Sequence, residues 1–183
     1  ETAQGLQQFT DAIIATGPHQ LKTIMMDLPA PVFDYQPITT VYLQFPPATR
    51  LPHAVMGLCH GVAHWVFDRG QCCDQPGLLA VVISAHGILQ SDKTVLIQQC
   101  ITELNQALSI YGMQLDESPA WTQVITEKRA TFSCTAALHR PFTNTAQPHI
   151  YLAGDYVDGP YPATIEGAVR SGLSAAKQIL AAT

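Results

Sequence analysis

The chain has 183 residues, of which 47% are hydrophobic and 13% charged, and its mean hydropathy is +0.11. This composition excludes intrinsic disorder and indicates more apolar surface than a domain of this size needs for its own core, so we expect an apolar ligand or a further domain. Nine basic against fourteen acidic residues give a net charge of -5 without a basic stripe, which excludes a nucleic-acid partner.

The cysteines and the ends of the chain indicate the compartment. Five cysteines are an odd number, two of them (Cys72 and Cys73) are adjacent, and no secretory leader precedes them, which predicts free thiols in the cytoplasm. No apolar run reaches the roughly 20 residues that span a bilayer. The chain begins at Glu1 rather than at Met, directly before a strand-like segment, so we expect it to be part of a longer protein.

The first half of the chain predicts mainly strands. Residues 9–15 have the composition of a short buried strand, and residues 21–28 place apolar side chains on one helical face. Residues 38–45 alternate as a half-buried strand does, residues 54–69 indicate a hairpin, and residues 77–85 indicate a deeply buried strand. These strands predict an antiparallel sheet. The buried face of the strand over 38–45 would carry Val41, Leu43 and Phe45.

The middle of the chain predicts one helix. Apolar residues at helical spacing predict a helix over 92–111, which Gly112 would end. Residues 121–134 return to β-type composition, and a polar connector over 141–148 follows. The apolar face of the helix would consist of Ile97, Ile101, Leu104, Leu108 and Tyr111.

The last part of the chain predicts a short strand over 150–156 and a long final helix. Glu166 and Arg170 would pair along that helix at i,i+4 spacing. The opposite face is apolar and rich in small residues, so we expect it to pack closely on a sheet or a ligand. Its members are Ile165, Ala168, Val169, Gly172, Leu173, Ala176 and Leu180.

Residues 150–172 combine a strand, a glycine with a carboxylate, and a helix start, which is a pattern suited to a nucleotide-type ligand. Gly154 lets a ligand approach the backbone, and Asp155 can accept hydrogen bonds from sugar-type hydroxyls. The first helical turn, over 164–168, carries unpaired N–H groups and partial positive charge, which favour an anion such as the N1 and C2 carbonyl edge of a reduced flavin. No G-x-G, Walker A, G-x-S-x-G or H-E-x-x-H motif is present.

The string "LAGDYVDGPYPATIEGAVRSGLSAA" resembles the C-terminal signature of the flavin amine oxidase and phytoene desaturase superfamily. Together with "YQPITTVYLQF", "HWVFDRG", "GLLAVVISA" and "EKRATFSC", it is most similar to the squalene-associated, FAD-dependent desaturases within that superfamily. This resemblance implies an α+β protein, with an antiparallel-sheet substrate domain and the C-terminal strand and helix of a Rossmann-like FAD-binding domain whose G-x-G-x-x-G half lies upstream. The FAD domain would take residues 1–31 and 146–183, and the substrate domain residues 32–145.

The resemblance also implies the residues that contact FAD. Gly154 and Asp155 would contact its phosphate and ribityl region, and Ala15 and Thr16 would border the cofactor cleft. The flavin edge would be lined, mainly through backbone atoms, by Tyr161, Pro162, Thr164, Ile165, Glu166, Gly167 and Ala168. No metal site is expected, because His60 and His64 lie in a predicted strand, where their spacing places them about 13 Å apart.

The implied reaction is flavin-dependent, reductive loss of a hydroxyl group from a long isoprenoid, which gives squalene. Polar candidates for substrate contact are Tyr42, Lys128 and His139, with Trp121 as a wall of the pocket, and no catalytic residue can be assigned. Alternatives are a carotenoid-type desaturase, an amine oxidase, and a lipid-binding module without catalysis. We further expect the upstream half of the protein as a partner, self-association through the exposed surface, and peripheral contact with the cytoplasmic membrane.

Overall fold

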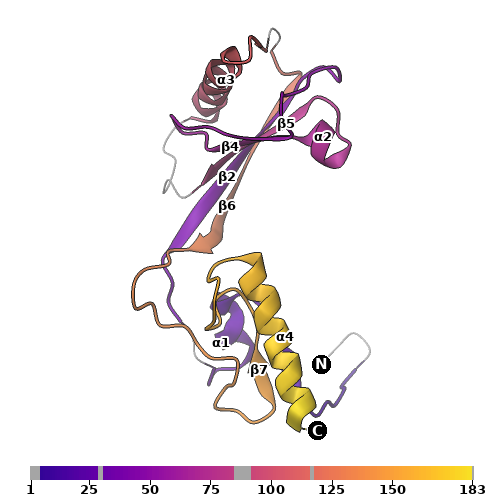
Figure 1. Cartoon of the computed structure of the whole chain (residues 1–183). Coiled ribbons are helices and arrows are strands. Elements are labelled where there is room, and N and C mark those ends of the chain that lie inside the picture. Colours follow the sequence, from indigo (N-terminus) through magenta and orange to yellow (C-terminus); the bar gives the residue numbers. More distant parts are fainter. Residues whose placement is uncertain (1–4, 29–30, 85–91, 116–117, 183) are drawn as a thin grey trace. The chain divides into compact units, whose positions relative to one another are not determined.

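A computed structural model describes residues 5–28, 31–84, 92–115 and 118–182. The chain divides into two compact units (Figure 1). Unit 1 combines Glu1–Asp34 with Phe132–Thr183, and unit 2 is Tyr35–Thr131. The chain leaves unit 1 after Asp34 and returns to it at Phe132.

Unit 2 contains a five-stranded sheet in the order β3-β4-β5-β2-β6. The strand bounds are Tyr35–Gln44 (β2), Val55–Gly57 (β3), Trp65–Asp68 (β4), Leu78–Ser84 (β5) and Trp121–Phe132 (β6). Strands β3 and β4 form the expected hairpin, and β5 pairs antiparallel with both β4 and β2. The predicted antiparallel sheet is therefore confirmed. The last residue of the strand predicted over 77–85 lies outside the described residues.

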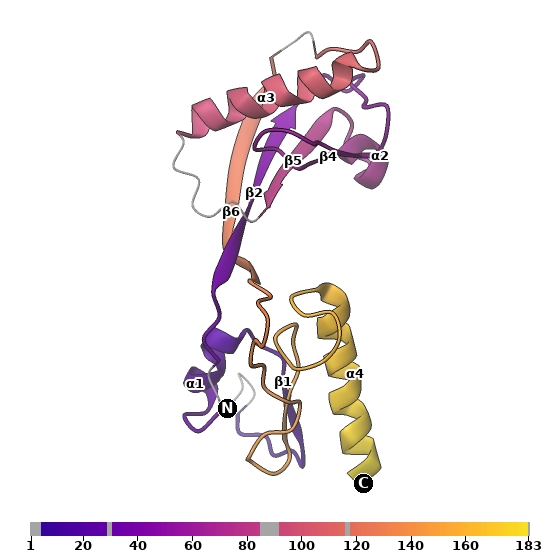
Figure 2. The same ribbon diagram turned by 60° about the vertical axis from the view of Figure 1, so that its left-hand side comes forward.

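Helix α3, Lys93–Ser109, covers one face of this sheet (Figure 2). Asp92 accepts a hydrogen bond from the Thr94 N–H (2.7 Å) at its beginning, and Gly112 follows its end with a φ of 65°. The predicted buried face of the helix is partly wrong, because the stripe in contact with the sheet is rotated by about one position. Its buried residues are Leu96, Cys100, Leu104 and Leu108, whereas Ile97 and Ile101 are half-buried and Tyr111 is exposed.

The short helix α2, Arg69–Cys73, begins at the buried Asp68, whose side chain is 0% exposed. The Asp68 carboxylate accepts hydrogen bonds from the Leu51 N–H (2.9 Å), the Gln71 N–H (3.1 Å) and the Gln71 side chain (2.7 Å). Burial alone would raise the pKa of Asp68, but these hydrogen bonds hold it below its usual value. Asp68 is therefore an ionised structural residue that joins three segments of unit 2.

Unit 1 contains two short parallel strands and a long helix. Strand β1, Ala12–Ile14, pairs with β7, Ile150–Leu152, and the final helix α4 spans Ile165–Ala182. A 3-10 turn, Pro18–Gln20, leads into the short helix α1, Leu21–Ile24. Strand β1 and helix α1 are each shorter than predicted from the sequence. Together the two units confirm a mixed α and β fold with an antiparallel sheet.

Helix α4 contacts β1 and β7 through small side chains. Ser171 and Ala175 are its buried residues, and the predicted pairing of Glu166 with Arg170 is confirmed at 2.6 Å. The larger residues of the predicted apolar face do not pack against the described part of unit 1. Their exposed fractions are 86% for Ile165, 53% for Val169, 57% for Leu173 and 77% for Leu180. Within the described part of the chain, these four side chains therefore lack the close packing partner that the sequence led us to expect.

Candidate functional site

The carboxyl ends of β1 and β7 meet at one edge of their two-stranded sheet. The strands run parallel with Ile14 opposite Leu152, and the Ala153 N–H donates to the Ile14 carbonyl (3.0 Å). Ala15 and Thr16 therefore leave the sheet beside Gly154 and Asp155. This edge is where open parallel sheets bind ligands, and the structure brings together here two predicted site segments from opposite ends of the chain.

Gly154 is required where β7 enters the following loop. A Cβ atom at this position would collide with the ring of Tyr156, which is buried and cannot easily move aside. The Gly154 N–H donates to the Ser171 hydroxyl (2.8 Å), which ties the glycine to α4. The glycine therefore lets the chain pass close to the Tyr156 ring, which fills the space that a side chain at position 154 would take.

Asp155 lies near the beginning of α4. Its carbonyl accepts a hydrogen bond from the Ala163 N–H (3.2 Å), one residue before Thr164 and two before the helix starts. Its side chain is partly buried, and this burial raises the pKa of the carboxyl group above its usual value. A hydrogen-bond donor on a ligand would stabilise the ionised form of this carboxylate, which burial disfavours.

Thr164 caps the first turn of α4. Its hydroxyl accepts from the Gly167 N–H (3.0 Å) and donates to the Tyr161 carbonyl (2.7 Å), as a helix N-cap does. The same carbonyl leaves no room for a Cβ at position 167. Tyr161 and Ala163 have φ values of 62° and 57°, a region that is uncommon for residues other than glycine. Strained backbone of this kind tends to cluster at ligand sites.

The Tyr161 ring is held by a cation at the start of α4. Arg170 lies over the ring, 4.9 Å from its centroid, and its Nε donates to Glu166 (2.6 Å). The contact with Glu166 raises the pKa of the Arg170 guanidinium. The structure thus places all the predicted flavin-edge residues in one loop and one helical turn. These are Tyr161, Pro162, Thr164, Ile165, Glu166, Gly167 and Ala168.

Two residues that hold this loop were missed from the sequence. Arg140, with only 11% of its side chain exposed, donates to the carbonyls of Val157 (2.9 Å) and Gly159 (2.6 Å) and lies 3.4 Å from the Asp158 carboxylate. Ser171, on α4, accepts a hydrogen bond from the Gly154 N–H at the beginning of the loop. No local pattern indicated either residue, because both contacts join segments that are distant in the sequence.

The three predicted substrate residues of unit 2 do not lie on one face of its sheet. Thr39 is buried and its hydroxyl lies 2.8 Å from that of Thr126, so the even-numbered residues of β6 share the face that α3 covers. By strand alternation, Lys128 belongs to that face. Tyr42 and Trp121 belong to the opposite face, which we call the open face of the sheet. His139 is exposed in unit 1.

The open face carries a continuous set of aromatic and apolar side chains. The strand register places Tyr42, Ala80, Phe67 and Val55 in one row across β2, β5, β4 and β3. The adjacent row consists of Thr40, Val82, Trp65 and Gly57. The Ala120 N–H donates to the Gln44 carbonyl (2.7 Å), which brings Trp121 close to the first row.

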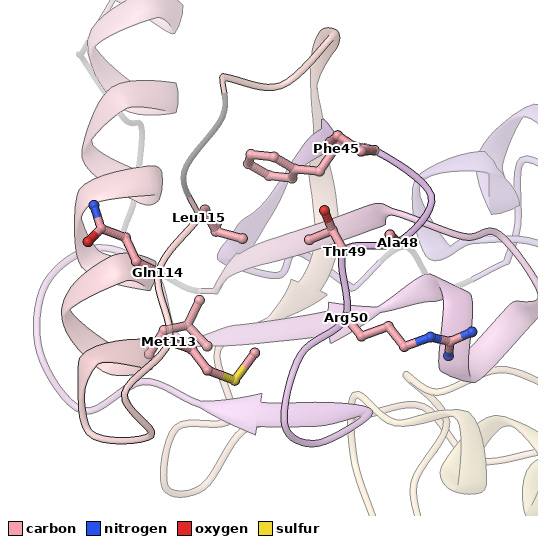
Figure 3. Close-up of a pocket in the computed structure, with 9 residues that line it drawn as sticks. Phe45, Ala48, Thr49, Arg50, Met113, Gln114 and Leu115 are labelled. Carbon is pink, nitrogen blue, oxygen red and sulfur yellow. The ribbon is translucent and has the colours of Figure 1, made fainter.

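A separate hollow of about 450 Å³ lies in unit 2 beside the end of α3 (Figure 3). Phe45, Met113 and Leu115 contribute apolar side chains to it, and Thr49 and Arg50 lie at its border. None of the predicted site residues lines this hollow.

Within the described ranges, no group of three or more histidine, cysteine or acidic side chains is placed to hold a metal ion. In the same ranges, no helix combines the length and the hydropathy that a membrane span requires.

Residues 1–180 match the family described as flavin containing amine oxidoreductase. The hydroxysqualene dehydroxylase of Zymomonas mobilis is 32% identical over 166 residues, which are 90% of this chain and 37% of the relative. The enzyme of the same name from Rhodopseudomonas palustris is 32% identical over 173 residues, 93% of this chain and 38% of the relative. The chain therefore spans less than two fifths of the length of these curated relatives.

A solved structure shows a similar fold. The crystal structure of a candidate protoporphyrinogen oxidase from Exiguobacterium sp. 255-15 matches with a TM-score of 0.56 and 15% identity, over 97% of this chain and 43% of that one. At this identity, the likeness concerns the fold alone. The match over residues 1–180 shows that the chain belongs to the family of flavin-containing amine oxidoreductases.

Proposed function

We propose that this chain forms the C-terminal part of an FAD-dependent oxidoreductase that removes the hydroxyl group of hydroxysqualene reductively and yields squalene. The observation that carries the proposal is the meeting of three elements in unit 1. The carboxyl ends of β1 and β7, the Gly154-Asp155 pair and the capped beginning of α4 lie together. The names of the relatives supply the substrate class.

The residues present fit a flavin nucleotide. The Thr16 hydroxyl oxygen is buried and has no hydrogen-bond partner in the part of the chain that the structure describes, although it lies at the strand edge where ligands bind. The partly buried Asp155 follows the end of β7 at the same edge, and burial raises the pKa of its carboxyl group. An unsatisfied hydroxyl and a carboxylate that can accept hydrogen bonds from hydroxyl groups match the polar tail of FAD.

In this proposal each residue has a binding or positioning role. When bound, FAD supplies hydride or electron transfer to the isoprenoid carbon. Asp155 accepts hydrogen bonds from the ribityl hydroxyls, and Thr16 borders the same cleft. The N–H groups of Gly167 and Ala168 already donate to Thr164, so the first turn of α4 would favour the anionic edge of the ring mainly through its partial positive charge. Tyr161, fixed by Arg170, contributes to the wall beside it.

We place the isoprenoid on the open face of the sheet in unit 2. Tyr42, Phe67 and Trp65 supply aromatic surface there, and Trp121 lies close to them. Such a wall excludes water, which would otherwise quench a carbocation-like carbon or a hydride donor. In this arrangement Lys128, which lies on the opposite face and is exposed there, does not contact the isoprenoid.

Unit 1 belongs, in this proposal, to a Rossmann-like FAD domain whose other strands lie in the upstream part of the protein. Parallel sheets are normally covered on both faces, and α4 exposes Ile165, Val169 and Leu173. The upstream part would cover this stripe. Without it the chain should associate with itself, and light scattering that shows a monodisperse monomer would argue against this part of the proposal.

The cofactor role of Asp155 can be tested in the protein expressed from its complete reading frame. We expect Asp155→Ala to weaken FAD binding by about 1.5–3 kcal/mol, the scale of a hydrogen bond to a charged group. Asp158→Ala is the matched control, because Asp158 is a more exposed carboxylate in the same loop, paired with Arg140. Titration of the apoprotein with FAD measures both, and unchanged affinity in Asp155→Ala would remove the assigned role.

The substrate is tested by incubating the same protein with hydroxysqualene, FAD and a reductant, and identifying the products by mass. Formation of squalene supports the proposal. Conversion of phytoene, or of an amine, without conversion of hydroxysqualene would favour the alternative enzymes. A colourless protein that binds isoprenoids would favour a lipid-binding module.

A further inference from the structure

We propose that Ser171 is a positioning residue of the candidate flavin site: its hydroxyl fixes the peptide groups of Gly154, so that Asp155 and the loop before α4 take the conformation that binds the cofactor. This inference rests on the proposed function, since it assigns a residue to the same site. Ser171 itself lies on α4, seventeen positions beyond the glycine.

Three hydrogen-bonding groups surround the Ser171 hydroxyl. It accepts from the Gly154 N–H (2.8 Å), and its oxygen lies 3.0 Å from the Gly154 carbonyl and 2.7 Å from the Ala168 carbonyl. Because a hydroxyl carries one proton, the two carbonyls share it. Ser171 is only 7% exposed, so water cannot readily replace the hydroxyl if it is removed.

The hydrogen bonds between Ser171 and Gly154 hold the beginning of the loop that joins β7 to α4. Residues 153–164, between β7 and α4, contain neither helix nor strand, so their conformation depends on contacts with other parts of unit 1. Arg140 holds the middle of this loop and Thr164 its end. Ser171 holds its beginning, directly before Asp155, and it does so from the helix whose first turn belongs to the same site. The loop and the helix start are thereby set relative to one another.

A buried serine in a helix often bonds only the carbonyl three or four residues before it. The contact with Ala168 alone would satisfy that role. The contact with the Gly154 N–H goes beyond it, because this N–H would otherwise be a buried donor at the ligand edge of the sheet. The experiment must therefore separate the effect on cofactor binding from the effect on folding.

We would compare Ser171→Ala with Ser174→Ala in the protein expressed from its complete reading frame. Both serines lie on α4 and line the same small cavity of about 150 Å³, but the only hydrogen bond at the Ser174 hydroxyl recorded among the described residues is a long one from Gln178 (3.4 Å). We expect Ser171→Ala to raise the dissociation constant of FAD about tenfold, and Ser174→Ala to change it less than about twofold. The rise in melting temperature caused by FAD should shrink in Ser171→Ala alone.

The outcomes are distinct. Wild-type affinity in Ser171→Ala overturns the inference, and so does a melting temperature that falls equally with and without FAD, since that marks a purely structural serine. A wild-type protein that binds no flavin overturns the proposed function and the inference with it. If Ser171→Ala does not fold, Ser171→Cys provides the test, because a thiol has similar size and hydrogen-bonds weakly; it should bind FAD less tightly than wild type, and equal binding overturns the inference.

Discussion

The two units differ in how they bury apolar side chains. In unit 2, a five-stranded sheet packs one face against α3, and this core contains fully buried residues from the sheet and the helix. In unit 1, two strands of three residues each support an 18-residue helix, and the largest apolar side chains of that helix are exposed. Unit 2 therefore carries its own packed core, whereas the described part of unit 1 leaves apolar surface uncovered.

This difference bears on the function, because the candidate flavin loop lies in unit 1. There the loop is held by the buried side chains of Tyr156 and Val157 and by polar contacts from Arg140, Thr164 and Ser171. Contact with the upstream part of the protein and with the bound ligand should therefore stabilise this site. We therefore expect mutations in unit 2 to act on stability, and mutations in unit 1 to act on binding and association.

The sharpest test of this difference compares two leucines on the two long helices. Leu104 of α3 is 0% exposed, so Leu104→Ala should destabilise unit 2 by about 2–5 kcal/mol through lost burial and a cavity. Leu173 of α4 is 57% exposed, and Leu173→Ala should change the unfolding free energy of this chain by less than about 0.5 kcal/mol.

Urea denaturation measures both effects. The two tryptophans of the chain, Trp65 and Trp121, lie in unit 2, so their fluorescence reports that unit, and far-UV circular dichroism adds the helix of unit 1. Equal losses in the two variants would show that α4 is packed as tightly as α3, which would contradict the comparison.

A smaller effect is expected at Asp68. Asp68→Asn replaces a carboxylate that accepts three hydrogen bonds in unit 2, and should cost about 1–3 kcal/mol at neutral pH. Because the folded-state pKa of Asp68 is lowered, its stabilisation is present above the ordinary value of 3.8 and is lost as the pH falls through the folded-state value. Denaturation series at several pH values should show this loss in the wild type and not in the variant. A wild type that is insensitive to pH in that range would contradict the role given to Asp68.

The smallest effect on stability is expected at Asp155, and it has the opposite sign. Burial raises the folded-state pKa of Asp155, so its protonated form favours the fold below the ordinary value of 3.8, and this contribution is lost as the pH rises through the folded-state value. Asp155→Asn should leave the chain as stable as wild type or slightly more stable at neutral pH, while it weakens FAD binding. Melting curves with and without FAD measure both quantities. A clear loss of stability without FAD would indicate that the carboxylate serves the fold.

The sequence predicted the elements whose signal is local. Alternation along residues 38–45 indicated which side chains of β2 face the core, and Val41, Leu43 and Phe45 are indeed buried. Helix α3 was predicted, but its buried face was predicted only in part, because Cys100 packs as a small hydrophobic residue between Leu96 and Leu104. Burial also raises the pKa of this thiol to about 12.

For the candidate site, the sequence predicted the local motif but not the contacts that join distant segments. The glycines, Asp155 and Thr164 belong to one continuous motif, so their proximity followed from the sequence. The roles of Arg140 and Ser171 depend on contacts across unit 1, and the periodicity of α4 could not indicate which of its faces meets the strands. Pairing of β1 with β7 likewise joins the two ends of the chain, and only the three-dimensional arrangement reveals it.

The central claim is that the loop between β7 and α4 binds the flavin. Hydrogen–deuterium exchange of the protein from its complete reading frame, recorded with and without FAD, tests it most directly. The account predicts that FAD slows exchange in residues 153–168 and at Ala15 and Thr16, and that β3 and β4 in unit 2 change little. Bound FAD that leaves exchange in residues 153–168 unaltered would contradict the claim.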